Sequence, residues 1–147
     1  MKNYIINKNT CAIVKKNKNT LIIEDEKVFL VNSSILTIIN NSCKYYGSDY
    51  RGRLNSVNCI LRSKYKNPIL INENYNLILF PTESIRNNNA MFINYKKIIN
   101  YDLYYDIIRI FFTNKIMLTT KISKYIFSEQ LLKCVIFNNI LNLRKKT

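Results

Sequence analysis

The sequence has no histidine and no tryptophan, and it contains only two glycines, two prolines and two alanines. The absence of histidine removes the commonest general base and the usual partner of a catalytic cysteine or serine. Two glycines are too few for a dinucleotide-binding fingerprint or a glycine-rich linker. Gly47 and Gly52 have the spacing of a phosphate loop, but the lysine and hydroxyl residue that would reach phosphate and magnesium are missing. We therefore do not expect an enzyme.

The cysteines are few and scattered, and none forms a Cys-x-x-Cys pair: Cys11, Cys43, Cys59 and Cys134. A zinc site would need all four thiolates from distant segments, so we expect buried thiols and neither a metal nor a cofactor. No stretch approaches the roughly 20 apolar residues of a membrane span. The apolar start of the chain is interrupted after Ile6, unlike a signal peptide. We expect a reduced cytoplasmic protein with no membrane partner.

The composition is that of a globular domain with a large positive charge. The 147 residues are 48% hydrophobic and carry a formal net charge of +14. Isoleucine, asparagine, lysine and tyrosine account for 75 residues, and their codons are rich in A and T. Drift in an AT-rich genome adds lysines without selection, so arginine positions carry more information. Three of the six arginines, Arg51, Arg53 and Arg62, fall within twelve residues.

The positive charge is concentrated in three zones. Residues 1–20 carry +5, residues 44–66 carry +5 and residues 115–147 carry +6, whereas residues 21–43 carry −2 and residues 67–114 are balanced. Zoned positive charge favours a surface that contacts a polyanion such as nucleic acid. A generally basic, solvated surface is the alternative.

Local patterns predict an α+β fold of short antiparallel strands, two central helices and a long C-terminal helix. Short β-favouring runs separated by turn residues indicate strands at 4–6, 11–14, 21–23, 28–31, 69–71, 77–80, 91–95, 107–112 and 116–118. Ser33 is a candidate N-cap of the first helix, which Gly47 ends. Ser48 or Asp49 can cap the second helix, and Asn67-Pro68 ends it. Ser123 can cap the final helix, which continues to Leu143.

The second helix has two neighbouring stripes. Tyr50, Leu54, Val57 and Leu61 recur at helical spacing, and Arg51, Asn55, Asn58 and Arg62 follow one residue later. One residue corresponds to about 100° of helical rotation, so an apolar face lies beside a guanidinium-and-amide face. Lysines and arginines neutralise phosphates, and arginine and asparagine suit the acceptors of A·T pairs in the minor groove. An ordinary solvated helix face is the alternative.

We therefore expect Arg51 and Arg62 to enter or flank the minor groove, and Asn55 and Asn58 to contact base acceptors. Nearby cations would hold phosphates: Lys44, Arg53, Lys64 and Lys66.

The final helix also has two apolar stripes. Phe127, Leu131, Cys134 and Leu141 form one, and the other consists of Tyr125, Leu132, Ile136, Ile140 and Leu143. One stripe can cover the sheet of its own domain. The other, which includes Tyr125, Leu132, Ile136 and Ile140, serves either an oligomer interface or a deeper core, and the sequence leaves both open.

Residues 42–53, Ser-Cys-Lys-Tyr-Tyr-Gly-Ser-Asp-Tyr-Arg-Gly-Arg, resemble the signature of the competence transcription factor (ComK) family, Ser-Cys-basic-aromatic-aromatic-Gly-Ser-x-Tyr-x-Gly-Arg. Lys66-Asn67-Pro68-Ile69 and Leu79-Phe80-Pro81-Thr82 are similar to a second block of that family. Weaker similarity continues through Phe92-Ile93, the turn at residues 113–115, and Ile122-Ser123 into the last helix. Phe92 stands where the family usually has tryptophan.

The resemblance implies a bacterial transcriptional activator of DNA-uptake genes. Such a protein binds pairs of A-tract and T-tract boxes from the minor groove, acts as an oligomer and assists RNA polymerase. We accordingly expect one ComK-like DNA-binding domain over residues 1–147, without the family's longer C-terminal tail, and associated with the nucleoid. Double-stranded DNA, RNA polymerase and a second copy of the chain are the expected partners. The alternatives are a non-specific nucleic-acid-binding protein, and a truncated paralogue that oligomerises without activating transcription.

Overall fold

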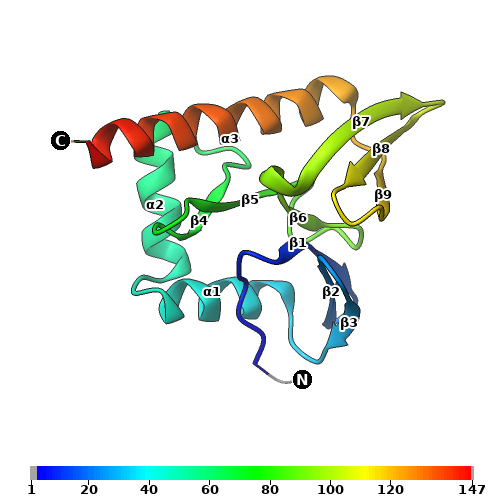
Figure 1. Ribbon diagram of the computed structural model, residues 1–147, viewed down its shortest axis with the longest axis horizontal. Helices are drawn as coiled ribbons and strands as arrows, with labels where there is room; N and C mark the ends of the chain where they lie inside the picture. The colour runs from blue at the N-terminus through cyan, green and yellow to red at the C-terminus, as the bar shows by residue number, and fades with distance from the viewer. Residues whose placement is uncertain (1–2, 147) are drawn as a thin grey trace.

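The computed structural model describes residues 3–146 of the chain (Figure 1). Nine strands, three α-helices and one short 3-10 helix follow one another within this range: β1 Thr10–Lys16, β2 Asn19–Glu24, β3 Val28–Val31, α1 Ile35–Tyr45, α2 Tyr50–Leu61, β4 Ile69–Asn72, β5 Leu77–Pro81, β6 Met91–Asn94, η1 Tyr95–Lys97, β7 Ile98–Tyr104, β8 Ile107–Phe112, β9 Met117–Thr120 and α3 Lys124–Lys145. The expected α+β class, with two central helices and a long C-terminal helix, is confirmed.

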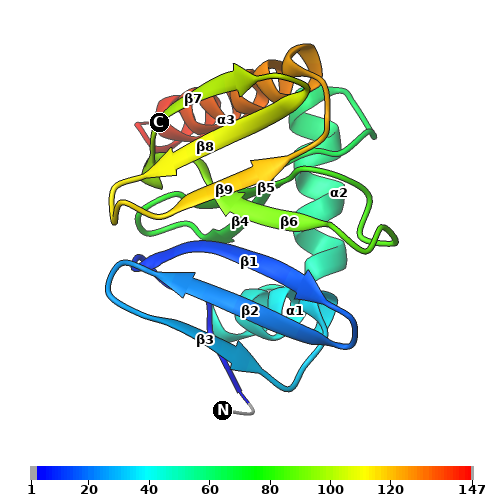
Figure 2. The same ribbon diagram turned by 90° about the vertical axis from the view of Figure 1, so that its right-hand side faces the viewer.

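The strands form two antiparallel sheets. The larger sheet has the order β3-β2-β1-β6-β5-β4, and the smaller sheet has the order β7-β8-β9. Pairing of β1 with β6, which includes Ile13 opposite Phe92, joins two three-stranded meanders into the six-stranded sheet. Figure 2 shows the strands in front and the helices behind them. One side of the molecule is therefore made of strands and the other of helices.

The core lies between the larger sheet and the helices. Phe80 of β5 and Phe127 of α3 are fully buried and meet edge to face, with ring centroids 5.8 Å apart. Tyr101 of β7 packs against Phe127 at 4.8 Å, which connects the smaller sheet to the same cluster. The buried Gln130 of α3 donates to the carbonyl of Pro81 at 2.8 Å. The long helix thus contacts both sheets and holds them together.

Most of the expected turns and caps are confirmed. The turn that separates β2 from β3 is closed by the Glu24 N–H donating to the Lys27 carbonyl at 2.9 Å. Lys115 has a φ of +70° in the turn between β8 and β9. The Ser123 side chain accepts from the Ile126 N–H at the start of α3. Short polar residues therefore begin and end these elements as their side-chain chemistry predicts.

Three local expectations are wrong, and one strand was missed. The N-cap of α1 is Ser34, not Ser33. Residues 4–6 form no strand, although Ile6 is buried and its N–H donates to Ser42 Oγ at 2.9 Å. The second helix ends at Leu61, because Arg62 adopts the left-handed conformation, with a φ of +53°. Strand β7 was not expected.

Cysteine burial matches expectation at three positions only. Cys11, Cys43 and Cys134 are buried, and burial raises the pKa of Cys11 to about 12 and that of Cys43 to about 11. Cys59 is exposed on α2, contrary to the expectation of buried thiols. None of the helices between residues 3 and 146 is both long enough and apolar enough to cross a membrane.

Candidate nucleic-acid interface

The start of α2 is set by the loop that joins it to α1. Gly47 has a φ of +94°, a conformation that a side chain would strain. Asp49 then caps α2, its carboxylate accepting the Gly52 N–H at 2.6 Å. Asn40 of α1 accepts the Tyr50 N–H at 2.9 Å. The two helices are therefore held at a defined angle, and the first turn of α2 lies beside α1.

The apolar stripe of α2 faces the core, as predicted. Val57 is fully buried, and Tyr50, Leu54 and Leu61 are partly buried against the core cluster. The opposite face is exposed at Arg51, Gly52, Asn55, Ser56 and Cys59. Burial of one face orients the other toward solvent.

A groove between α1 and α2 brings three of the predicted DNA-contacting residues together. Its volume is about 550 Å³, and Lys44 of α1 lines it together with Arg51 and Asn55 of α2. Asp49 contributes the one carboxylate of the lining. Two cations and an amide thus gather at one end of α2, where phosphate and base acceptors are both suitable ligands.

Three more of the predicted cations lie at the far end of α2. Arg62 and Lys64 are exposed, and the Lys66 Nζ lies 5.1 Å from the centroid of the Tyr65 ring. This loop is fixed to α3, because Lys133 Nζ donates to the Tyr65 carbonyl at 2.6 Å. Arg51 and Arg62 are eleven residues apart, which corresponds to roughly 16 Å along the helix axis.

Lys133 adds a cation that sequence reasoning missed at this end. Its Nζ lies 5.9 Å from the centroid of the Tyr65 ring. Burial lowers the pKa of Lys133. No spacing within residues 44–66 could reveal it, since it lies on α3.

Asn58 and Arg53 are less accessible than the helical period suggests. Asn58 is half-buried, and its side-chain amide contacts the side-chain amide of the buried Asn67 at 2.9 Å. The loop after α2 folds back over this part of the helix, so the exposed line runs through Arg51, Asn55 and Cys59 instead. Arg53 is half-buried, and its positive charge lowers the pKa of the neighbouring Cys43 against the larger effect of burial.

Comparison with known proteins identifies the family of this chain. The family model described as "ComK protein" matches residues 1–146. The chain belongs to the ComK family. A curated relative, the "Competence transcription factor" of Bacillus subtilis (strain 168), is 32% identical over 88 residues, which cover 57% of this chain and 46% of the relative. The match thus spans about half the length of that relative. No solved structure matches the chain.

The ComK signature at residues 42–53 coincides with the joint between α1 and α2. Ser42 Oγ donates to the Ile38 carbonyl at 2.7 Å and accepts the Ile6 N–H, and Cys43 is buried beside it. A Cβ added at Gly52 would lie 2.9 Å from Asp49 Oδ1, so a larger residue there would displace the capping carboxylate. The signature therefore combines residues that build the joint with the cations that it exposes.

Removing the cap of α2 tests how the joint is held. We expect Asp49→Ala to lower the free energy of unfolding by about 1 kcal/mol, because the Gly52 N–H loses its acceptor. Asp49→Asn retains an acceptor and is the matched control, with an expected change within about 0.5 kcal/mol. Urea denaturation measures both variants. Equal losses in the two variants would show that the carboxylate does not act as a cap.

Proposed function

We propose that this protein is a transcriptional activator of competence genes that binds A/T-rich DNA through the minor groove. The observation that carries the proposal is the gathering of Lys44, Arg51 and Asn55 on one exposed groove, at the joint where the family signature lies. Assistance to RNA polymerase at promoters and association with the nucleoid form part of the same proposal.

The side chains of α2 are suited to binding A/T-rich DNA. Arg51 and Asn55 are exposed on adjacent turns and donate hydrogen bonds of the kind that the N3 and O2 acceptors of A·T pairs receive. Narrow A-tract grooves concentrate negative potential and attract guanidinium groups. Arg62 supplies a second guanidinium at the far end of the helix. Phosphates on either side would be held by Lys44, Arg53, Lys64 and Lys66.

Asn58 has a different role in this proposal. Its amide is already engaged with Asn67, and a base contact would require that contact to open. We therefore assign base contacts to Asn55 and a positioning role to Asn58, which holds the loop that presents Lys64 and Lys66.

We also propose that α3 forms the interface with a second copy of the chain. Tyr125 is 74% exposed, Leu132 is 50% exposed and Ile136 is 42% exposed, whereas Phe127, Cys134 and Phe137 are buried. Their exposure supports an interface rather than a deeper core. Ile140 is partly buried at the margin of this face. Exposed apolar side chains in a line along a helix are typical of helix–helix association.

Substitutions at both ends of α2 test the DNA contacts. We expect Arg51→Ala and Arg62→Gly to weaken binding to A/T-rich duplexes by about 1–3 kcal/mol each and to reduce the preference over G/C-rich duplexes. Glycine is used at position 62 because it accepts the left-handed backbone. Gel-shift titration with both duplexes measures the effect.

Lys64→Ala is the matched control for a sequence-independent phosphate contact. It should weaken binding to both duplexes alike and lower the salt slope by about one unit. Unchanged affinity and unchanged preference in the two arginine variants would remove α2 from the interface.

Charge placed on the α3 face tests self-association. We expect Leu132→Glu and Ile136→Glu each to weaken dimerisation at least roughly tenfold, because a carboxylate would lose water in the interface. Sedimentation equilibrium over a concentration series measures it. Leu30→Glu on β3 is the control, since Leu30 is also exposed, at 53%, but lies off α3. Wild-type protein that remains monomeric at high micromolar concentration would contradict this part of the proposal.

A further inference from the structure

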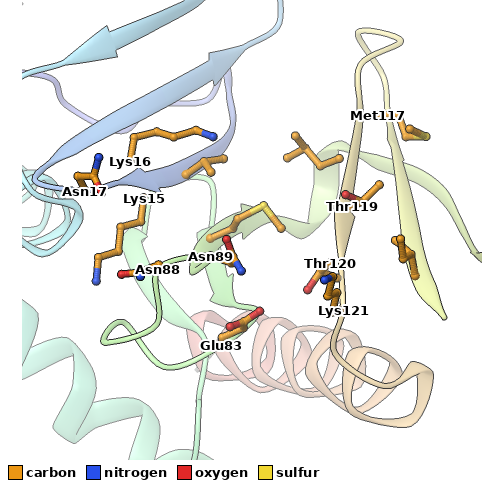
Figure 3. A pocket seen from close by; sticks show the side chains of 14 residues that line it. Lys15, Lys16, Asn17, Glu83, Asn88, Asn89, Met117, Thr119, Thr120 and Lys121 are labelled. Carbon is orange, nitrogen blue, oxygen red and sulfur yellow. The ribbon is translucent and has the colours of Figure 1, made fainter.

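A second groove lies on the strand side of the molecule, between the two sheets (Figure 3). Its volume is about 640 Å³, and it is lined by β1 and β6 of the larger sheet, by the loop between β5 and β6, and by β9 of the smaller sheet. None of the residues predicted to contact DNA lines it. In Figure 2 the strands lie in front of α2, so this groove and the α2 face are separate surfaces.

The groove runs along an unpaired strand edge. Strand β9 pairs with β8 on one side, and no strand in the part of the chain that the structure describes pairs with its other side. Residues 117–121 all line the groove, odd and even positions alike. Successive side chains of a strand point to opposite faces of a sheet, so a groove lined by both sets follows the edge of the strand. Such an edge offers backbone N–H and C=O groups to another extended chain.

The rim of the groove is basic. Lys16 lies on one wall and Lys121 on the opposite wall (Figure 3). Both are exposed, and neither has an ion-pair partner within residues 3–146. Lys15 is held in place, with its Nζ donating to the Ile85 carbonyl at 2.7 Å. Glu83 is the one carboxylate of the lining, and Asn87 donates to it at 3.0 Å. The net charge of the lining favours an acidic occupant.

Between these walls the lining is apolar. Val14, Met91 and Leu118 contribute to it, together with Met117, which is 46% exposed. Methionine side chains adapt to differently shaped partners, because they are unbranched and polarisable. A strand laid along β9 would alternate its side chains between this lining and the lysines at the rim.

We propose that this groove binds an extended acidic segment of a partner protein, which adds as a strand to the free edge of β9. Acidic side chains of the segment pair with Lys16 and Lys121, and alternate apolar side chains contact the apolar lining at Met117. The four residues of β9 extend over roughly 14 Å, which accommodates a segment of about five residues. Nucleic acid suits the site less well, because phosphates use neither the strand edge nor the apolar lining.

The test uses the full chain and a fluorescein-labelled decapeptide that alternates glutamate with valine. We expect saturable binding by fluorescence anisotropy. The same peptide with alternate backbone amides N-methylated should lose binding, since it cannot complete the strand pairing. Lys16→Glu with Lys121→Glu should weaken binding roughly tenfold, through the loss of two ion pairs and the repulsion that replaces them. Lys8→Glu with Lys146→Glu makes the same change in net charge away from the groove and should leave binding unchanged.

Four outcomes would overturn the proposal. The first is the absence of saturable binding, and the second is equal weakening by the two double variants. The third is unchanged binding of the N-methylated peptide. A loss of A/T-rich duplex binding in the Lys16→Glu, Lys121→Glu variant, with peptide binding unaffected, would assign the groove to DNA and would also overturn it. Arg51→Ala should weaken DNA binding and leave peptide binding intact, so this proposal and the DNA-binding proposal fail separately.

Discussion

The burial of one face of α2 is the constraint on which the proposed DNA-binding surface depends. Val57 is fully buried, and Leu54 and Leu61 pack beside it against the core. In a chain with a net charge of +14, repulsion between like charges opposes any clustering of lysine and arginine side chains. Apolar burial of about 25 cal/mol per Å² is insensitive to that charge, so it can hold a basic face in place without a neutralising partner. The cations of α2 are thereby oriented before any polyanion arrives.

The proposed surface also depends on the joint between α1 and α2, which brings basic side chains of both helices to one groove. Lys44 and Arg51 lie on different helices, and they line one groove only because Gly47 turns the chain and Asp49 begins the next helix. This explains why one short motif contains both small turn residues and basic residues. The turn residues determine where the basic residues point.

Much of the fold could be predicted from local chemistry, because caps, turns and alternating strands are encoded within a few residues. Strand β7 was not predicted, because its register shifts between Ile98 and Asn100 and the alternation of apolar and polar side chains is interrupted there. The site was predictable in part. The helical period of α2 identified the exposed Arg51 and Asn55, but the loop that covers Asn58 returns from residues 62–67. Lys133 lies on α3 and adds its charge near the C-terminal end of α2. Contacts between distant segments leave no periodic signal in the sequence.

The strand side and the helix side of the molecule carry different chemistry. The α2 face offers guanidinium and amide groups around a helix, the α3 face offers exposed apolar side chains, and the groove at β9 offers a strand edge with a basic rim. Each surface is centred on a different element, and the α2 and α3 surfaces come close to each other where Lys133 of α3 contacts Tyr65. This arrangement fits the proposed contacts with DNA, a second copy and another protein.

The most direct test of the central claim is to attach an iron–EDTA cleavage reagent to Cys59, which is exposed on α2 while the other three thiols are buried. The conjugate is bound to an A/T-rich duplex, and strand scission is mapped on both strands, with Cys59→Ser as the control. The account predicts localised cleavage within the A/T-rich boxes, with the maxima on the two strands offset toward their 3′ ends, as expected for a source in the minor groove. An offset toward the 5′ ends, or binding without localised cleavage, would contradict it.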